Sequence, residues 1–102
     1  MTYEELYDYL SEQYDKFNDA LHEAICRLNW QQANEGKRTY TKVWGLEWLS
    51  GLSIQGTLEQ IEYILANYEK LIKFCERKER SRSCLILHIN KQLAKARERA
   101  GA

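Results

Sequence analysis

The most regular pattern in the chain runs through residues 3–28, where apolar side chains recur alternately four and three residues apart. This spacing places them on one face of an α-helix for nearly four heptads. The apolar positions are Tyr3, Tyr7, Leu10, Tyr14, Phe17, Leu21, Ala24 and Leu28. Thr2 and Glu5 fit the S/T-x-x-E capping box, and Gly36 suits the left-handed position after a last turn. The sequence therefore predicts an amphipathic helix over about 3–35.

Acidic residues follow the opposite side of this helix with equal regularity. They are Glu4, Asp8, Glu12, Asp15, Asp19 and Glu23. At about 100° per residue, the acidic and apolar stripes lie roughly 155° apart around the helix axis. A row of carboxylates about 6 Å apart is close to the spacing of a phosphate backbone, so it suits a basic surface on a partner. A solvated outer face is the simpler interpretation of the same row.

Two more segments carry helical periodicity. The segment at about 58–79 opens with a second capping box, Thr57 with Gln60, and its apolar residues are spaced three, four, three, four and three. They are Leu58, Ile61, Leu65, Tyr68, Ile72 and Cys75, widened by Ile64 and Leu71. The segment at about 83–98 repeats this spacing with Ile86, Ile89, Leu93 and Ala96. A strand at 84–89 is the alternative there, but the good helix formers that follow it favour a helix.

Residues 37–56 have the weakest pattern. Alternation and β-branched residues over 37–43 are typical of a strand, whereas Thr41 suits the cap of a short helix over 42–50. We prefer the helix, because a lone strand would have no partner unless 84–89 paired with it. This part of the chain is therefore expected to be irregular apart from one short helix.

Three tryptophans are expected at one end of the resulting bundle. Trp44 and Trp48 are four residues apart and share a face of the short helix. With Trp30 they are expected to close the bundle, where their indole N–H groups would need hydrogen-bond partners. Gly51 and Gly56 then bracket an irregular connection to the next helix.

Composition fits an all-helical fold. The chain has 102 residues, no proline, and four of its five glycines between positions 36 and 56. Its 44% apolar and 29% charged residues are typical of a globular protein. We therefore expect an all-α fold with a single domain over 1–102: a small helical bundle of three long amphipathic helices plus one short Trp-bearing helix.

Segments that would direct the chain to a membrane or out of the cell are not apparent. The start of the chain lacks the basic, apolar and small-residue regions of a signal peptide, and no apolar run approaches the roughly 18 residues of a membrane helix. Three cysteines without framework spacing are typical of reduced thiols. A cytoplasmic location and no membrane partner are therefore expected.

Charge is balanced overall but uneven along the chain. The net charge is −6 over residues 1–36, −1 over 37–69 and +7 over 70–102. The basic residues that would suit nucleic-acid phosphates are Arg77, Lys78, Arg80, Arg82, Lys91, Lys95 and Arg99. Aromatic residues for base stacking are scarce there, since only Phe74 is nearby. A simpler interpretation is that the acidic and basic ends pack together and neutralise each other.

Two weaker patterns involve histidine. His22 with Cys26, and Cys84 with His88, are each four residues apart, so facing helices would supply the two thiolates and two imidazoles of a tetrahedral zinc site. Partly buried thiols and surface imidazoles are the simpler interpretation. Arg82 and His88 match the loose R-x4-6-H spacing of HEPN-type ribonucleases, which are helical bundles. This resemblance implies a general base at His88.

The leading prediction is a non-enzymatic protein–protein interaction module. Its most concrete form is a small regulator, inhibitor or accessory subunit, in phage or bacterial style, of a nucleic-acid-handling complex; it would bind a basic protein surface through the acidic residues of the first helix. The alternative is a module that binds the nucleic-acid backbone through its basic C-terminal helix. Tyr3, Tyr7 and Tyr14 suit a partly wet interface, which favours a homo-oligomer through the first helix. No catalytic residue, cofactor or metal is assigned.

Overall fold

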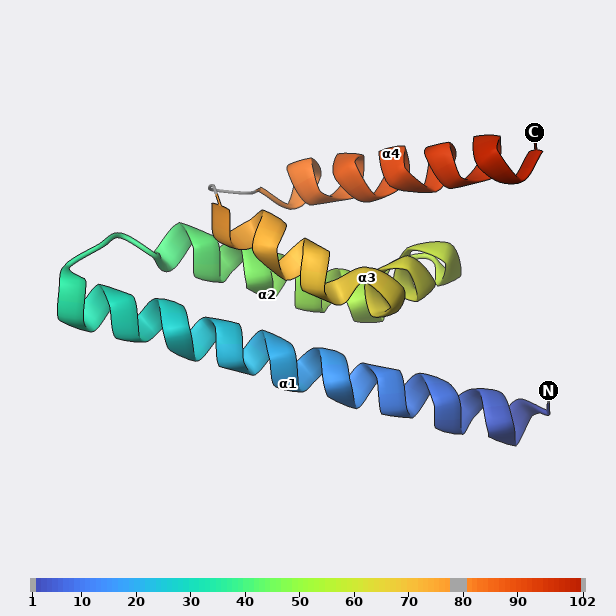
Figure 1. The fold of residues 1–102 in the computed structure, drawn as a ribbon, viewed down its shortest axis with the longest axis horizontal. Coiled ribbons are helices and arrows are strands. Elements are labelled where there is room, and N and C mark those ends of the chain that lie inside the picture. The colour runs from blue at the N-terminus through green and yellow to red at the C-terminus, as the bar shows by residue number, and fades with distance from the viewer. Residues whose placement is uncertain (1, 78–80, 102) are drawn as a thin grey trace.

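Four α-helices joined by short connections make up the computed structural model, which describes residues 2–77 and 81–101 (Figure 1). They are α1 (Tyr3–Glu35), α2 (Tyr40–Gln55), α3 (Leu58–Arg77) and α4 (Arg82–Gly101). The predicted all-α bundle of three long helices and a shorter Trp-bearing one is confirmed. Among the described residues there is no strand, so the strand alternatives at 37–43 and 84–89 are wrong.

Both ends of α1 are capped by the residues that the sequence indicates. The Thr2 hydroxyl accepts a hydrogen bond from the Glu5 N–H at 3.2 Å, and the Glu5 carboxylate accepts one from the Thr2 N–H at 3.4 Å. At the other end Gly36 has φ 66°, a left-handed conformation that favours glycine, and its N–H donates to the Gln32 carbonyl at 3.2 Å. Between these caps α1 is continuous for 33 residues.

The helix predicted over 42–50 is longer at both ends. It begins at Tyr40 with Thr39 as its N-cap, and it continues through Gly51, where an irregular connection was expected. The buried Thr39 hydroxyl makes no capping bond to α2; it donates instead toward the Leu28 carbonyl and Gln32 Oε1, each at 3.1 Å. Thr39 therefore anchors the connection to α1. Because α2 already begins at Tyr40, the cap predicted at position 41 is wrong.

The third helix opens as predicted but is not straight. The Gln60 N–H donates to the Thr57 hydroxyl at 3.2 Å, and the Gln60 side chain accepts from the Thr57 N–H at 3.0 Å. Asn67 has non-helical φ −129° and ψ 23°, and its side-chain amide donates to the Tyr63 carbonyl at 3.0 Å. That bond takes the acceptor of a regular helix turn, which accounts for the kink. The last predicted positions, 78–79, lie outside the described residues.

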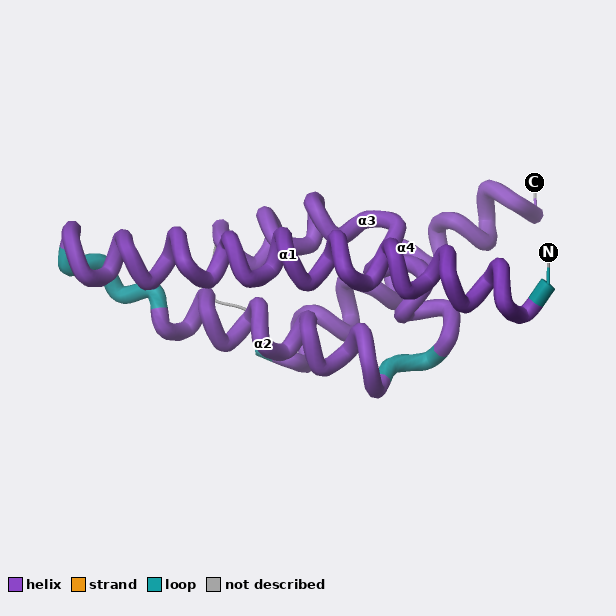
Figure 2. Tube along the Cα trace, turned by 90° about the horizontal axis from the view of Figure 1, so that it is seen from below, coloured by secondary structure: helices purple, strands orange, loops and turns teal. Residues whose placement is uncertain are grey.

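The α2–α3 pair forms a central layer, with α1 on one side and α4 on the other (Figures 1 and 2). Consecutive helices run in opposite directions, so both chain termini lie at one end of the molecule. The α1–α2 and α3–α4 connections lie at the other end. Among the described residues α1 and α4 make no contact, whereas each contacts both α2 and α3.

The core is aliphatic and centred on the α2–α3 layer. Its buried residues are Phe17, Leu21, Ala24 and Leu28 from α1, Leu46, Leu49 and Leu52 from α2, Ile64, Leu65, Leu71, Ile72 and Cys75 from α3, and Leu85 and Ile89 from α4. Phe17 packs edge-on against Tyr14 and Tyr68, with ring centroids 6.2 Å apart in each case. The predicted stripe of α1 is thus buried only from its middle onward.

The tryptophans do not close the bundle as the sequence suggested. Trp30, Trp44 and Trp48 are 62%, 54% and 44% exposed. The leucines of α2 recur three residues apart and take the side that faces the core, which leaves Trp44 and Trp48 on the outer side of the same helix.

Alanine is expected to have opposite effects at Gly51, in the interior of α2, and at Gly56, its C-cap. In the interior of α2, a Cβ on Gly51 would meet nothing within 4 Å, so Gly51→Ala should raise the free energy of unfolding by about 0.5–1 kcal/mol. A Cβ on Gly56 would lie 2.5 Å from the Leu52 carbonyl oxygen, so Gly56→Ala should lower it by about 1–2 kcal/mol. Urea unfolding followed by circular dichroism measures both, and changes of the same sign would contradict this end of α2.

Candidate interaction surfaces

All six predicted acidic residues lie on one exposed face of α1, which we call the acidic face: Glu4, Asp8, Glu12, Asp15, Asp19 and Glu23. Glu12 pairs with Lys16 at 3.3 Å, but both side chains are more than half exposed, so the pair contributes little. Within the described part of the chain, the other five carboxylates make no ion pair. Because α1 is continuous, it holds them in a rigid row.

The basic end of the chain does not neutralise the acidic face. α4 lies across the α2–α3 layer from α1, and the two helices make no contact among the described residues. The ion pair that joins α1 to another helix has the opposite polarity, since Arg27 of α1 donates to Glu76 of α3 at 2.7 Å. For the described residues, the interpretation that the acidic and basic ends pack together is therefore wrong.

The predicted basic residues fall into two groups. Lys91, Lys95 and Arg99 are exposed and four residues apart, and they form a basic stripe along α4. Arg77 and Arg82 are exposed where α3 ends and α4 begins. None of these five makes an ion pair within the described residues. The remaining two predicted positions, 78 and 80, lie outside the described residues.

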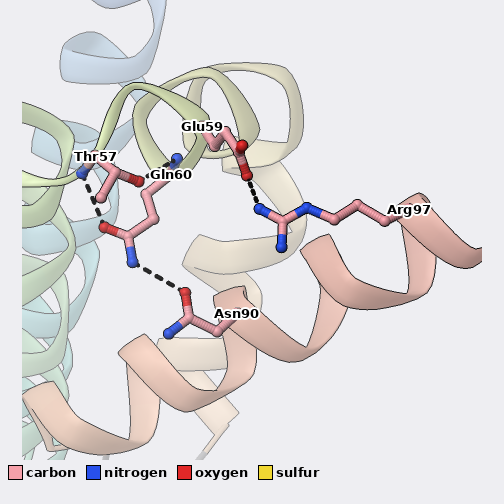
Figure 3. A network of polar contacts seen from close by, with 5 residues as sticks. All are labelled: Thr57, Glu59, Gln60, Asn90 and Arg97. Atoms are coloured by element: carbon pink, nitrogen blue, oxygen red, sulfur yellow. Dashed lines mark hydrogen bonds and ion pairs between the residues drawn. The ribbon is translucent and has the colours of Figure 1, made fainter.

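Polar contacts fix α4 against the first turn of α3 (Figure 3). The Gln60 amide nitrogen donates to Asn90 Oδ1 at 3.0 Å, while its oxygen completes the capping box with Thr57. Arg97 pairs with Glu59 nearby. Each exposed contact is worth no more than about 1 kcal/mol. Together they set the register of α4 against α3. Because Arg97 pairs with Glu59, its charge is neutralised within the chain.

Sequence reasoning missed an aromatic pocket beside Arg82. Trp44 and Trp48 from α2 and Arg82 from the start of α4 line a pocket of about 490 Å³. We call it the tryptophan pocket; its other lining residues are Glu47, Gly51, Leu52 and Gln55. The expectation that only Phe74 lies near the basic cluster is therefore wrong. The leucines spaced three apart in α2 were the signal that its tryptophans face outward.

At the end of the molecule where the termini lie, α1 projects beyond α2 and α3 (Figure 1). Every residue from Thr2 to Tyr9 is exposed, including Tyr3 at 92% and Tyr7 at 72%. Further along, an open groove of about 270 Å³ separates α1 from α3. Apolar side chains that line it are Tyr7, Leu10 and Tyr14 of α1 and Leu58, Ile61 and Leu65 of α3. The apolar stripe is thus real, but its first two turns have no helix to cover them.

The exposed surface is large for a chain of this mass. Its accessible area is 7315 Å², against about 6,000 Å² for a typical folded monomer of 12.1 kDa. Its radius of gyration is 15.0 Å, against about 13 Å for a typical domain of this length. The excess agrees with the projecting start of α1 and with exposed apolar residues that a partner can cover.

The two ends of the molecule also differ in charge. Of the described residues, 22–48, 73–77 and 81–84 belong to the end with the α1–α2 and α3–α4 connections, and they carry seven basic and four acidic residues. Residues 2–15, 55–66 and 90–101, at the end with the termini, carry eight acidic and four basic residues. At the connection end Lys37 pairs with Glu35 at 2.8 Å, and this hydrogen bond raises the pKa of the Lys37 ammonium.

The histidine and cysteine pairs do not assemble a zinc site. Cys26 Sγ lies 3.6 Å from His22 Nε2 on α1, but the second pair is on α4, which α1 does not contact. In the described part of the chain, no group of three or more histidine, cysteine or acidic residues is placed to hold a metal. The facing helices that the zinc interpretation required are absent from this packing.

The R-x4-6-H pattern does not converge on one site in α4. Six residues turn a helix by about 600°, so Arg82 and His88 point about 120° apart. Arg82 lines the tryptophan pocket, while the half-buried His88 stacks on Phe74 with ring centroids 4.1 Å apart and planes at 13°. His88 is thus part of the α3–α4 packing.

No protein-family model, curated protein or solved structure matches the chain. Of the helices described, none is long and apolar enough to cross a membrane. The surfaces of the chain itself are therefore the basis for a functional proposal.

Proposed function

We propose that the chain is a non-enzymatic protein–protein interaction module. In its most concrete form it is a small regulator, inhibitor or accessory subunit of a nucleic-acid-handling complex, and it presents the acidic face of α1 to a basic surface of its partner. The observation that carries this proposal is that five of the six carboxylates have no ion-pair partner among the described residues. None of the three cysteines forms a disulfide, which is compatible with action in the reducing cytoplasm.

The geometry of α1 supports insertion into a groove on the partner. From Glu4 to Glu23 the acidic face extends roughly 28 Å at 1.5 Å per residue. The first turns are exposed on all sides, so a groove can hold the carboxylates on one wall and Tyr3 and Tyr7 on the other. Charge complementarity of this kind speeds association and fixes orientation, while aromatic side chains supply most of the binding free energy.

Charge reversal on the acidic face should abolish capture of the partner without unfolding the protein. The triple variant carries Asp8→Lys, Glu12→Lys and Asp15→Lys. All three positions are exposed, so the circular dichroism spectrum and the melting temperature should change little. Tagged protein in extracts of the native host, followed by mass spectrometry, should lose the basic protein that the wild type retains.

The matched control makes three equal charge changes away from this face. Glu47, Glu69 and Glu98 are exposed and make no ion pair among the described residues, so their reversal to lysine changes net charge by the same amount. The control should retain the partner. If both triple variants retain the partner equally, the acidic face is a solvated surface and not the binding site.

The projecting start of α1 also favours a second copy of the chain as partner. Tyr3 and Tyr7 are exposed, and the excess accessible area is of the order that each subunit buries in an ordinary dimer, about 800 Å². Light scattering over a concentration series should show a monomer–dimer equilibrium that Tyr3→Ser, Tyr7→Ser shifts toward monomer. The exposed control Trp30→Ser should leave it unchanged; a wild type that stays monomeric at the highest concentration would contradict this interface.

A module that binds the nucleic-acid backbone is the second candidate function. It is favoured by the basic stripe of α4, in which Lys91, Lys95 and Arg99 are exposed and make no ion pair within the described residues. Non-specific DNA and RNA should then bind with micromolar affinity at low salt, and affinity should fall steeply as salt rises. Replacing all three residues by glutamine should flatten that dependence. The absence of binding at low salt would exclude this function.

A further inference from the structure

We propose that the tryptophan pocket is a binding site for single-stranded nucleic acid, in which a base stacks on an indole face and Arg82 holds a neighbouring phosphate. This inference deepens the second candidate function and rests on it, but it assigns recognition to α2 rather than to α4. The proposed ligand has unpaired bases, because a duplex keeps its bases stacked on each other.

Two indole rings lie on one side of α2 and line the pocket. Trp44 and Trp48 are one helical turn apart and 54% and 44% exposed, although burial of such large apolar rings is the usual outcome. Stacking on an aromatic ring is tolerant of base identity and contributes about 1–3 kcal/mol per base. Trp48 is therefore suited to bind a base without sequence preference.

Gly51 provides the open floor of the pocket. A glycine inside a helix costs about 1 kcal/mol relative to alanine, and no close packing contact requires it, since a Cβ there would meet nothing within 4 Å. The lack of a side chain instead leaves room next to Trp48 and Leu52 for a flat ring to approach the helix backbone. A packing role within the chain does not explain this glycine, whereas a bound base does.

Charge favours an anionic ligand. Arg82 reaches the pocket from α4, and among the described residues it makes no ion pair, so its guanidinium can donate to phosphate oxygens. Trp44 and Arg82 of the pocket belong to the connection end of the molecule, where basic residues outnumber acidic ones by seven to four among the described residues. Glu47 is the acid on the lining and opposes phosphate, so its removal gives a direct test of ligand charge.

The test is fluorescence anisotropy of labelled 12-nucleotide dT and U strands, and of a mixed-sequence DNA duplex, with the full chain at low and physiological salt. Trp48→Ala should weaken binding of both single strands by about 5- to 100-fold, with Trp48→Phe between the two. The matched control is Trp30→Ala, which removes a more exposed indole that does not line the pocket and should change affinity by less than about twofold.

Three further variants test the rest of the site. Arg82→Gln should weaken binding and lower the salt slope by about 0.7. Glu47→Gln should tighten binding, because it removes the carboxylate that opposes phosphate. Gly51→Leu keeps the helix but fills the floor, and should weaken single-strand binding. Circular dichroism spectra and melting of each variant verify that the fold is retained.

The outcomes separate this inference from the function on which it rests. Binding that Trp48→Ala and Trp30→Ala affect equally, with the duplex bound as well as the single strands, would overturn the pocket while leaving the basic stripe of α4 as the binding surface. No binding of any strand at low salt would overturn both. Weaker binding by Glu47→Gln would also overturn the pocket, since it would mean that the carboxylate attracts the ligand, as expected for a basic protein segment.

Discussion

Apolar packing of α2 against α3 is the contact on which the other features depend. Burial of one leucine or isoleucine side chain is worth about 1.5–3 kcal/mol, whereas an exposed ion pair is worth less than about 1 kcal/mol. The α2–α3 layer offers an apolar surface on each side, and α1 and α4 each bury their own stripe against one of them. Packing therefore outweighs the attraction between an acidic and a basic helix, and leaves both with exposed charge.

Much of the fold could be predicted from the sequence, and the predictions that were wrong have a common cause. Thr2 with Glu5, Thr57 with Gln60, and Gly36 act locally, so their roles followed from spacing alone. An apolar stripe shows which face of a helix is apolar but not how far its neighbours extend, so the sequence did not show where along α1 the exposed part would end. In α2 the leucines and the tryptophans form two competing apolar faces, and the spacing of the leucines was the signal, not used in the prediction, that they take the core.

The surfaces suit a small protein with two differently charged ends. In the proposed function the acidic, projecting start of α1 meets a basic protein surface; elsewhere Arg82 lines a pocket with two partly exposed indole rings. Association at one end and contact with a nucleic-acid strand at the other would place this chain between the two components of a complex. Neither surface needs the fold to rearrange, because both are held by helices that pack on the same core.

The separation of α1 from α4 is the central claim, and zero-length carbodiimide cross-linking of dilute monomer tests it most directly. The reagent joins carboxylates to lysines in contact, so peptide mass spectrometry should find Glu12 linked to Lys16 and Glu35 linked to Lys37, at ion-pair distances of 3.3 and 2.8 Å. No link should join the acidic face to Lys91 or Lys95. Such a link within the monomer would show that the two helices neutralise each other.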